Sequence, residues 1–202
     1  MTATRTGRLI VFEGPDGVGK STLARWFTEC LSAKGEQARF RSFPGSGEGT
    51  LGALVYKVHH APHDFKVTAI TATALQTLHI AAHLDAIERE IRPQILSGLT
   101  IVLDRYWWST FVYARVGGVS GNVLDRMIDL EKEVWKPVFP DKAFLIERNT
   151  PLRPEPTDLW PKWMETYREL AEAEKSQYPV HHIANNETLT DVQREIEKID
   201  EQ

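Results

Sequence analysis

Short apolar runs alternate with longer amphipathic segments along most of the chain. These runs predict five β-strands, over residues 8–12, 38–43, 100–103, 142–146 and 180–184, of which the first reads as buried. Apolar positions at helical spacing predict helices over residues 21–33, 67–96, 123–135, 163–175 and 190–199. Because strands that alternate with helices form parallel sheets, we expect an α/β fold, with a five-stranded parallel sheet flanked by helices in three layers.

Glycine and proline mark where several of these elements end. Pro44 stops the second strand, and four glycines between residues 45 and 52 predict a flexible loop after it. Pro93 predicts a dent in the long helix. No repeat or low-complexity linker divides the chain, so we expect a single domain over residues 1–202. Ligands of such sheets bind at the carboxyl ends of the strands, and the functional residues are expected there.

The first predicted strand leads into a glycine-rich segment that ends in a lysine and a serine. Residues 14–21 read Gly-Pro-Asp-Gly-Val-Gly-Lys-Ser and fit the P-loop pattern G-x-x-x-x-G-K-[ST] in full. We expect its backbone N–H groups to hold phosphate, with Lys20 on the phosphates and Ser21 on Mg²⁺. The alternative is a glycine-rich turn that binds nothing. The predicted cofactor-binding residues are Gly14, Pro15, Asp16, Gly17, Val18, Gly19, Lys20, Ser21 and Thr22.

A phosphate cradle of this kind needs a second acid to help hold magnesium. Asp104 follows the apolar run over residues 100–103, so its carboxylate is expected at the carboxyl end of a core strand. Arg105 comes next and can neutralise charge on a transferring phosphoryl group. The alternative is a charged pair that only ends the strand. We therefore predict a metal site formed by Ser21 and Asp104.

Composition narrows the class of protein and its surroundings. The net charge is -4, which argues against a general nucleic-acid binder. Cys30 is the only cysteine, so no disulfide can form within the chain, and a reducing compartment is favoured. No run approaches the roughly 18 apolar residues of a membrane span. We expect a cytoplasmic protein that has neither nucleic acid nor a membrane as its partner.

Two segments together resemble a known family. Residues 12–22 resemble the opening of thymidylate kinases, and Asp104-Arg105-Tyr106, followed by Ser109 and Tyr113, resembles that family's second motif. The likeness covers nearly the whole chain and is clearer in the first 115 residues. It implies a P-loop NTPase fold and a nucleoside monophosphate kinase that uses ATP and Mg²⁺. The implied acceptor is dTMP or a related pyrimidine deoxynucleotide, and the implied assembly is a homodimer.

The resemblance also implies roles for matching residues. Asp16 would lie near the acceptor's sugar and phosphate, and Arg105 between donor and acceptor phosphates. Phe43 and Pro44 would begin the loop beside the acceptor. Arg153 resembles the arginine that precedes the family's lid and lies near the donor base, and we expect a short lid segment over about residues 148–162. The expected catalytic residues are Lys20, Arg105, Asp16 and Arg153. The expected substrate-binding residues are Phe43, Pro44, Ile80, His83, Arg105, Tyr106, Trp108 and Tyr113.

The chain departs from the family's pattern mainly on the acceptor side. Ile80 stands where thymidylate kinases usually have a phenylalanine that stacks on thymine, and Leu84 stands where they have an arginine. His79 or His83 could contact the ligand instead, although a helical histidine is more often packed or at the surface. Trp108 could wall the acceptor pocket, with core packing as its alternative.

The lid segment also differs from the family's. Residues 154–162 contain three prolines and one basic residue, Lys162, where family members usually carry arginines. Arg148 and Arg153 remain as candidates to stabilise the transition state. Three readings stay open: a thymidylate-like kinase, a kinase for a different phosphate acceptor, and a nucleotide-binding regulator with weak or lost activity. A polynucleotide end as acceptor is disfavoured by the acidic net charge.

Overall fold

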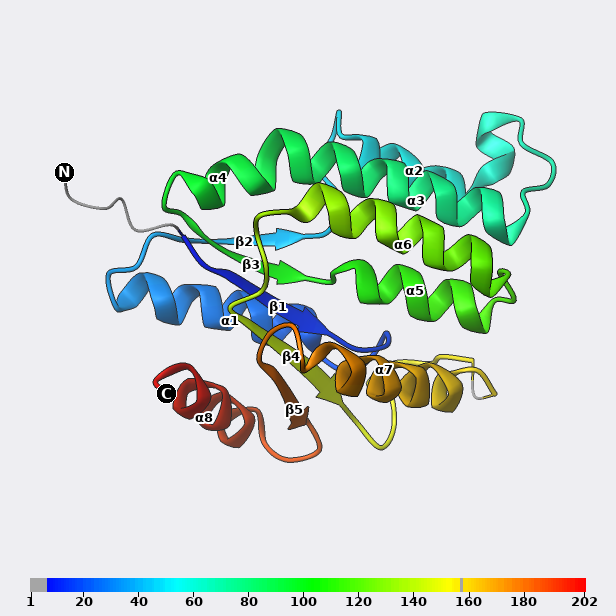
Figure 1. Ribbon diagram of the computed structural model, residues 1–202. Coiled ribbons are helices and arrows are strands. Elements are labelled where there is room, and N and C mark those ends of the chain that lie inside the picture. Colours follow the sequence, from blue (N-terminus) through cyan, green and yellow to red (C-terminus); the bar gives the residue numbers. More distant parts are fainter. Residues whose placement is uncertain (1–6, 157) are drawn as a thin grey trace.

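The computed structural model describes residues 7–156 and 158–202, and its centre is a sheet of five parallel strands (Figure 1). The strands are β1 (Leu9–Glu13), β2 (Ala38–Ser42), β3 (Thr100–Asp104), β4 (Lys142–Glu147) and β5 (Val180–Ala184). Their order across the sheet is β2-β3-β1-β4-β5, and every neighbouring pair is parallel. The predicted α/β fold with a five-stranded parallel sheet is confirmed.

Helices cover both faces of the sheet. They are α1 (Lys20–Ala33), α2 (Leu51–His60), α3 (Ala72–Ala86), α4 (Arg92–Leu96), α5 (Trp107–Val116), α6 (Gly121–Trp135), α7 (Trp160–Glu174) and α8 (Leu189–Asp200). Figure 1 shows α1 and α8 on one side of the sheet and the other helices on the opposite side. Helix α1 packs on β1, β2 and β3, whereas α4 packs on β3 and α7 on β4 and β5. The three predicted layers are therefore present.

The single long helix predicted over 67–96 is instead divided into three pieces. It begins at Ala72, because the Thr71 side chain accepts a hydrogen bond from the Ala74 N–H at 3.2 Å and so caps the first turn. A π-helical turn, Ile87–Ile91, separates α3 from α4. Pro93 lies in the first turn of α4, where its missing N–H leaves no hydrogen bond unmade.

The glycine-rich loop after β2 is shorter than predicted. Helix α2 begins at Leu51, and a 3₁₀ turn, Pro62–Phe65, follows it. Thr50 caps α2 by accepting the Ala53 N–H at 3.1 Å. Gly52 lies inside the helix, where a Cβ atom would come within 2.5 Å of the Gly45 carbonyl oxygen. The sequence pattern did not predict α2, because the glycines around its first turn resemble a loop.

The hydrophobic core explains why the charged residues gather at one edge. All five residues of β1 and of β3 are buried, and the Phe12 and Phe144 rings lie 5.0 Å apart between β1 and β4. The buried polar residues Glu13 and Asp104 are the last residues of these two strands. Both residues therefore lie at the carboxyl edge of the sheet. Across the described ranges, no helix has the length and apolar character that a membrane crossing needs.

Candidate active site

The P-loop joins β1 to α1 and brings its backbone close to neighbouring segments. Gly14 and Gly19 have φ angles of 135° and 94°, which side chains other than glycine rarely adopt. A Cβ atom on Gly14 would lie 2.4 Å from the Ile146 carbonyl oxygen, and one on Gly19 would lie 2.7 Å from Asn185 Nδ2. No side chain caps the first turn of α1. Its N–H groups and positive helix end are thus suited to an anion.

Lys20 bends back across the P-loop from the first position of α1. Its Nζ donates to the Pro15 carbonyl oxygen at 2.8 Å, and 5% of the residue is exposed. Burial, together with the positive charge of Arg105, lowers the pKa of Lys20 to about 8, against the opposite effect of nearby carboxylates. The ammonium therefore remains mostly charged at neutral pH, and an anionic ligand in the cradle would favour its charged form further.

Ser21 and Asp104, the two residues of the predicted metal site, lie together at the mouth of the cradle. The Ser21 hydroxyl donates to Asp104 Oδ2 at 2.5 Å. The second oxygen, Asp104 Oδ1, is buried and lacks a hydrogen-bond partner among the residues that the structure describes. The parallel register sets Phe12 of β1 beside Asp104 of β3, which brings the acid next to the P-loop. A buried carboxylate oxygen without a partner is suited to a cation.

Arg105 lies beside the cradle and binds a residue within it. Its Nη2 donates to Asp16 Oδ1, and its guanidinium carbon lies 5.7 Å from the centre of the Tyr113 ring. The Tyr113 hydroxyl in turn accepts the Asp16 N–H at 3.1 Å. Arg153 Nη2 lies 3.5 Å from the same Asp16 oxygen. Residues that are far apart in sequence are therefore joined into one charged cluster around Asp16.

The opposite charges within this cluster stabilise each other's ionised forms. Burial acts to raise the pKa of Asp16, but Arg105, Lys20 and Arg153 outweigh it and hold that pKa below its ordinary value. The pKa of Arg105 is raised well above its ordinary value: burial alone would lower it, and the Asp16 carboxylate is the main opposing cause. Both groups stay ionised at neutral pH. The cluster can therefore present a fixed guanidinium to a phosphoryl group.

The predicted acceptor-side residues Phe43 and His83 pack against each other at the end of β2. Their ring centroids are 4.2 Å apart. His83 Nδ1 is hydrogen-bonded to Glu131 Oε2 at 2.8 Å, and both side chains are buried. The carboxylate fixes the orientation of the imidazole, as in other histidine–carboxylate pairs. Glu131 belongs to α6, and nothing in the sequence pattern pointed to it.

Other predicted acceptor residues lie in the hydrophobic core. Trp108 is fully buried, and its Nε1 donates to the Tyr178 hydroxyl at 2.9 Å. The structure thus corrects the expectation that Trp108 walls a pocket, because its polar atom already has a buried partner. Tyr106 packs on Trp135 with ring centroids 5.0 Å apart, and Ile80 is 3% exposed. These side chains are therefore part of the hydrophobic core.

His79 is half-buried and lies beside a second histidine. Its Nε2 is 3.1 Å from His59 Nδ1. Burial, followed by the charges that His83, His59, Arg105 and His60 would carry, lowers the pKa of His79 to about 3. The imidazole is therefore neutral at physiological pH. The described parts of the chain contain no group of three histidine, cysteine or acidic residues able to hold a metal ion.

The segment expected to form a lid rests on the P-loop at one end. The Leu152 N–H donates to the Gly17 carbonyl oxygen at 2.8 Å. Arg153 is 63% exposed in its side chain and also pairs with Glu155 at 2.7 Å. Arg148 donates to the carbonyl oxygens of Asn185 and Thr150, so it is held away from Asp16. Residue 157, inside the expected lid over 148–162, lies outside the described residues.

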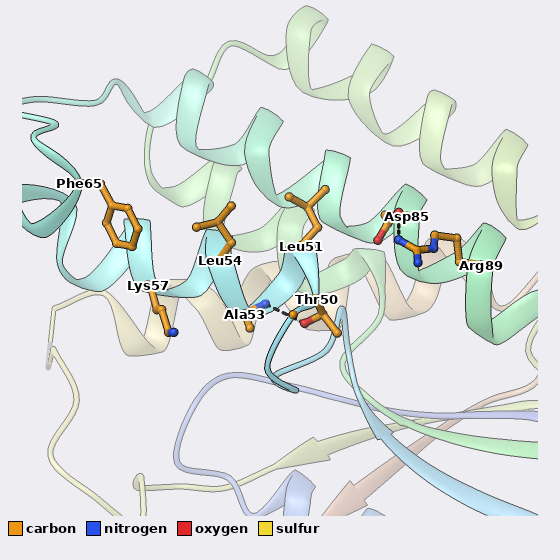
Figure 2. A pocket seen from close by; sticks show the side chains of 9 residues that line it. Thr50, Leu51, Ala53, Leu54, Lys57, Phe65, Asp85 and Arg89 are labelled. Atoms are coloured by element: carbon orange, nitrogen blue, oxygen red, sulfur yellow. Dashed lines mark hydrogen bonds and ion pairs between the residues drawn. The ribbon is translucent and has the colours of Figure 1, made fainter.

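A separate groove of about 500 Å³ runs along α2, away from the P-loop. Figure 2 shows that Leu51, Leu54 and Phe65 line it together with Lys57 and the ion pair of Asp85 with Arg89. None of the cradle residues takes part in it. The groove is therefore separate from the P-loop.

Several residues of the site were not predicted from sequence. Glu13 binds the start of α5, Asn185 Nδ2 donates to the Val18 carbonyl oxygen at 2.7 Å, and Trp160 Nε1 donates to the Asp16 carbonyl oxygen at 3.0 Å. Glu13 ends β1 and Asn185 follows β5. The rule that functional groups gather at the carboxyl ends of strands could have found both. Trp160 carries no such signal.

Comparison with known proteins identifies the family of the chain. The family model described as thymidylate kinase matches residues 12–196, which is most of the chain. The chain belongs to the thymidylate kinase family. Within this family, a thymidylate kinase from Cupriavidus metallidurans is 33% identical over 143 residues, and one from Pseudomonas syringae is 30% identical over 203 residues.

The extent of these family matches differs. The first alignment covers 70% of this chain and 65% of the Cupriavidus protein, so the chain spans just under two thirds of that relative's length. The second covers 93% of this chain and 92% of the Pseudomonas protein. A crystal structure of thymidylate kinase from Ehrlichia chaffeensis matches with a TM-score of 0.74, covering 96% of this chain and 98% of that one. At 20% identity, that match supports the shared fold.

Proposed function

We propose that the protein transfers the γ-phosphoryl group of ATP to a deoxynucleoside monophosphate, with dTMP or a related pyrimidine nucleotide as the acceptor. The observation that carries this proposal is the Arg105–Asp16 pair at the P-loop. It places a fixed guanidinium beside Lys20, where donor and acceptor phosphates would meet. Membership of the thymidylate kinase family gives independent support.

In the proposed reaction the acceptor phosphate is the nucleophile. One of its oxygens attacks the γ-phosphorus, and the bond from that phosphorus to the bridging oxygen of ADP breaks. The protein provides positioning and charge neutralisation rather than a covalent intermediate. Lys20 and the P-loop N–H groups bind the donor phosphates, whereas Arg105 and Arg153 stabilise negative charge between donor and acceptor. Asp16 holds both arginines in place.

A magnesium ion is part of this proposal. The Ser21 hydroxyl and the Asp104 oxygen that has no partner among the described residues are hard oxygen ligands at the mouth of the cradle, and they fit such a cation. When bound, Mg²⁺ would neutralise charge on the donor phosphates. The two residues would also orient the start of α1 toward those phosphates.

A panel of acceptors tests the proposed function. The protein is incubated with ATP, Mg²⁺ and each nucleoside monophosphate in turn, and the diphosphate products are measured. We expect dTDP from dTMP, and no product when EDTA removes the metal. Transfer only to another monophosphate would reassign the acceptor. Silence across the whole panel, with ATP still bound, would replace the proposed kinase by a nucleotide-binding regulator.

We further propose that the protein is a cytoplasmic homodimer. Helix α3 is apolar on more than one side, and Leu78 on α3 and Leu130 on the adjacent α6 are 37% and 51% exposed. A second copy with the same apolar face would cover such side chains. Sedimentation velocity should give a dimer for the wild type and a monomer for Leu78→Glu. The matched variant Leu189→Glu, on the opposite side of the sheet, should stay dimeric, and a monomeric wild type would contradict the proposal.

A further inference from the structure

The carboxylate of Glu13 is fully buried between the P-loop and the first turn of α5. Its Oε1 accepts the Tyr106 N–H at 2.6 Å and the Ser109 N–H at 3.0 Å. Its Oε2 accepts the Ser109 hydroxyl at 2.8 Å and the Gly14 N–H at 3.3 Å. Four donors therefore surround one carboxylate, and they come from two segments that would contact different substrates.

Glu13 takes the place of a helix cap that α5 does not have. The residue before α5 is Tyr106, and its side chain makes no capping hydrogen bond. The first N–H groups of a helix need an acceptor, and a negative charge near them is favourable. Glu13 supplies both from β1. The position of the α5 N-terminus is thus set by the strand that leads into the P-loop.

The hydroxyl of Ser109 connects Glu13 to Arg105. A hydroxyl has one proton to donate and two lone pairs that accept. The Ser109 proton goes to Glu13 Oε2, which leaves the lone pairs for Arg105 Nη1 at 3.1 Å and for the Tyr167 hydroxyl at 2.9 Å. Without the carboxylate, the hydroxyl could rotate away and the guanidinium would lose a fixed acceptor.

The backbone of Arg105 also depends on its neighbours. Its φ angle is 81°, in the left-handed region that costs a residue other than glycine about 1 kcal/mol or more. Such a conformation persists where the surrounding contacts fix it. The Arg105 N–H donates to the Phe12 carbonyl oxygen at 3.0 Å, and the next N–H, that of Tyr106, donates to Glu13. Residues 12 and 13 of β1 therefore hold the chain on both sides of the strained residue.

We infer that Glu13 is a positioning residue, which holds Arg105 in register with the P-loop by fixing Tyr106, Ser109 and the first turn of α5. This inference rests on the proposed function for its kinetic consequence, since Arg105 is the group that would contact the phosphates. An acidic side chain at this depth would otherwise be costly, because burial of a charge needs compensation.

A double-mutant cycle tests whether Glu13 acts through Arg105. Glu13→Gln keeps the shape of the side chain but replaces one acceptor oxygen by a donor amide. We expect kcat with dTMP to fall about 30-fold in the wild-type background, with KM for ATP changed less than 3-fold, and to fall less than 2-fold further in an Arg105→Ala background. Equal losses in the two backgrounds would overturn the inference, because Glu13 would then act independently of Arg105.

Two companion variants make the cycle specific. Ser109→Ala removes only the hydroxyl that links the two charged groups, so it should lower kcat about 10-fold and add little to Glu13→Gln. Glu36→Gln alters a carboxylate that binds Arg8 and Thr100 on another part of the sheet. It should leave kcat unchanged. Additive losses for Ser109→Ala and Glu13→Gln would contradict the proposed connection.

Amide hydrogen exchange gives a readout that does not depend on kinase activity. In Glu13→Gln, exchange over residues 105–110 should be at least 10-fold faster than in the wild type, while exchange over residues 9–12 stays within 2-fold. In Glu13→Asp, which keeps the charge on a shorter side chain, exchange over residues 105–110 should be intermediate between that of the wild type and that of Glu13→Gln. Glu13→Asp also replaces Glu13→Gln in both tests if Glu13→Gln does not fold. Unchanged exchange over residues 105–110 would overturn the positioning role. A wild type inactive on every monophosphate would instead contradict the proposed function, and exchange would still report on Glu13.

Discussion

Replacement of Lys20 by alanine is expected to lower kcat for phosphoryl transfer by about 10³-fold. The ammonium is nearly buried and points across the P-loop to the Pro15 carbonyl oxygen at 2.8 Å. Its positive charge would stay paired with the donor phosphates while their negative charge redistributes during phosphoryl transfer. A neutral methyl group cannot do so, and no other lysine belongs to the P-loop.

The fold should survive the Lys20→Ala change. Alanine is a good helix former at the start of α1, and the change removes a positive charge that burial disfavours. We expect the circular dichroism spectrum to be unchanged and the melting temperature to equal or exceed that of the wild type. Lys34→Ala, at the exposed end of the same helix, is the matched control and should keep full activity. Transfer by Lys20→Ala at a near-normal rate would refute the proposed role of the cradle.

Arg105→Ala is expected to lower kcat by about 10³-fold as well, because it removes the guanidinium that we propose lies between the donor and acceptor phosphates. Arg105→Lys should recover only part of this loss, since an ammonium keeps the charge but lacks the planar pair of donors that now binds Asp16 and Ser109. Initial rates at saturating ATP and dTMP give the comparison. Arg89→Ala, which changes an exposed arginine of the π-helical turn, is the control. Wild-type kcat in Arg105→Ala would remove Arg105 from the mechanism.

Arg105→Gly separates the charge of this residue from its backbone strain. Glycine adopts a φ angle of 81° without penalty, whereas alanine does not. Arg105→Gly should therefore be as inactive as Arg105→Ala but more stable by about 1 kcal/mol in urea unfolding. Equal stabilities of the two variants would show that the left-handed conformation relaxes once the arginine is gone.

The sheet was predictable because its signal is local. The central strands β1, β3 and β4 are buried and read as continuous apolar runs, and all five strands were found within one residue of their ends. The helices between β2 and β3 were less predictable. Their ends depend on single capping residues, Thr50 and Thr71, and on glycines whose approach to another segment decides whether they lie in a loop or a helix.

On the acceptor side, the sequence predicted neither the orientations nor the partners of the side chains. The sequence identified Ile80 and Leu84 as departures from the family's pattern, but it could not say which way neighbouring side chains face. The structure places Trp108 in the core against Tyr178 and pairs His83 with Glu131. These partners lie 70 and 48 positions apart in the sequence. The first pair depends on how α5 packs on the chain before β5, and the second on how α3 packs on α6, and no spacing rule encodes either.

The sequence by itself determined the phosphate cradle, because residues 14–21 form it from one continuous segment. Backbone N–H groups, one lysine and one hydroxyl need only the turn from β1 into α1 to converge. Only the tertiary structure decided how the cradle is completed. Asp104 and Arg105 reach it through the parallel register of β1 with β3, and Glu13 fixes Ser109 across 96 positions of sequence. Those contacts form when buried strands align, so they belong to the fold rather than to any local pattern.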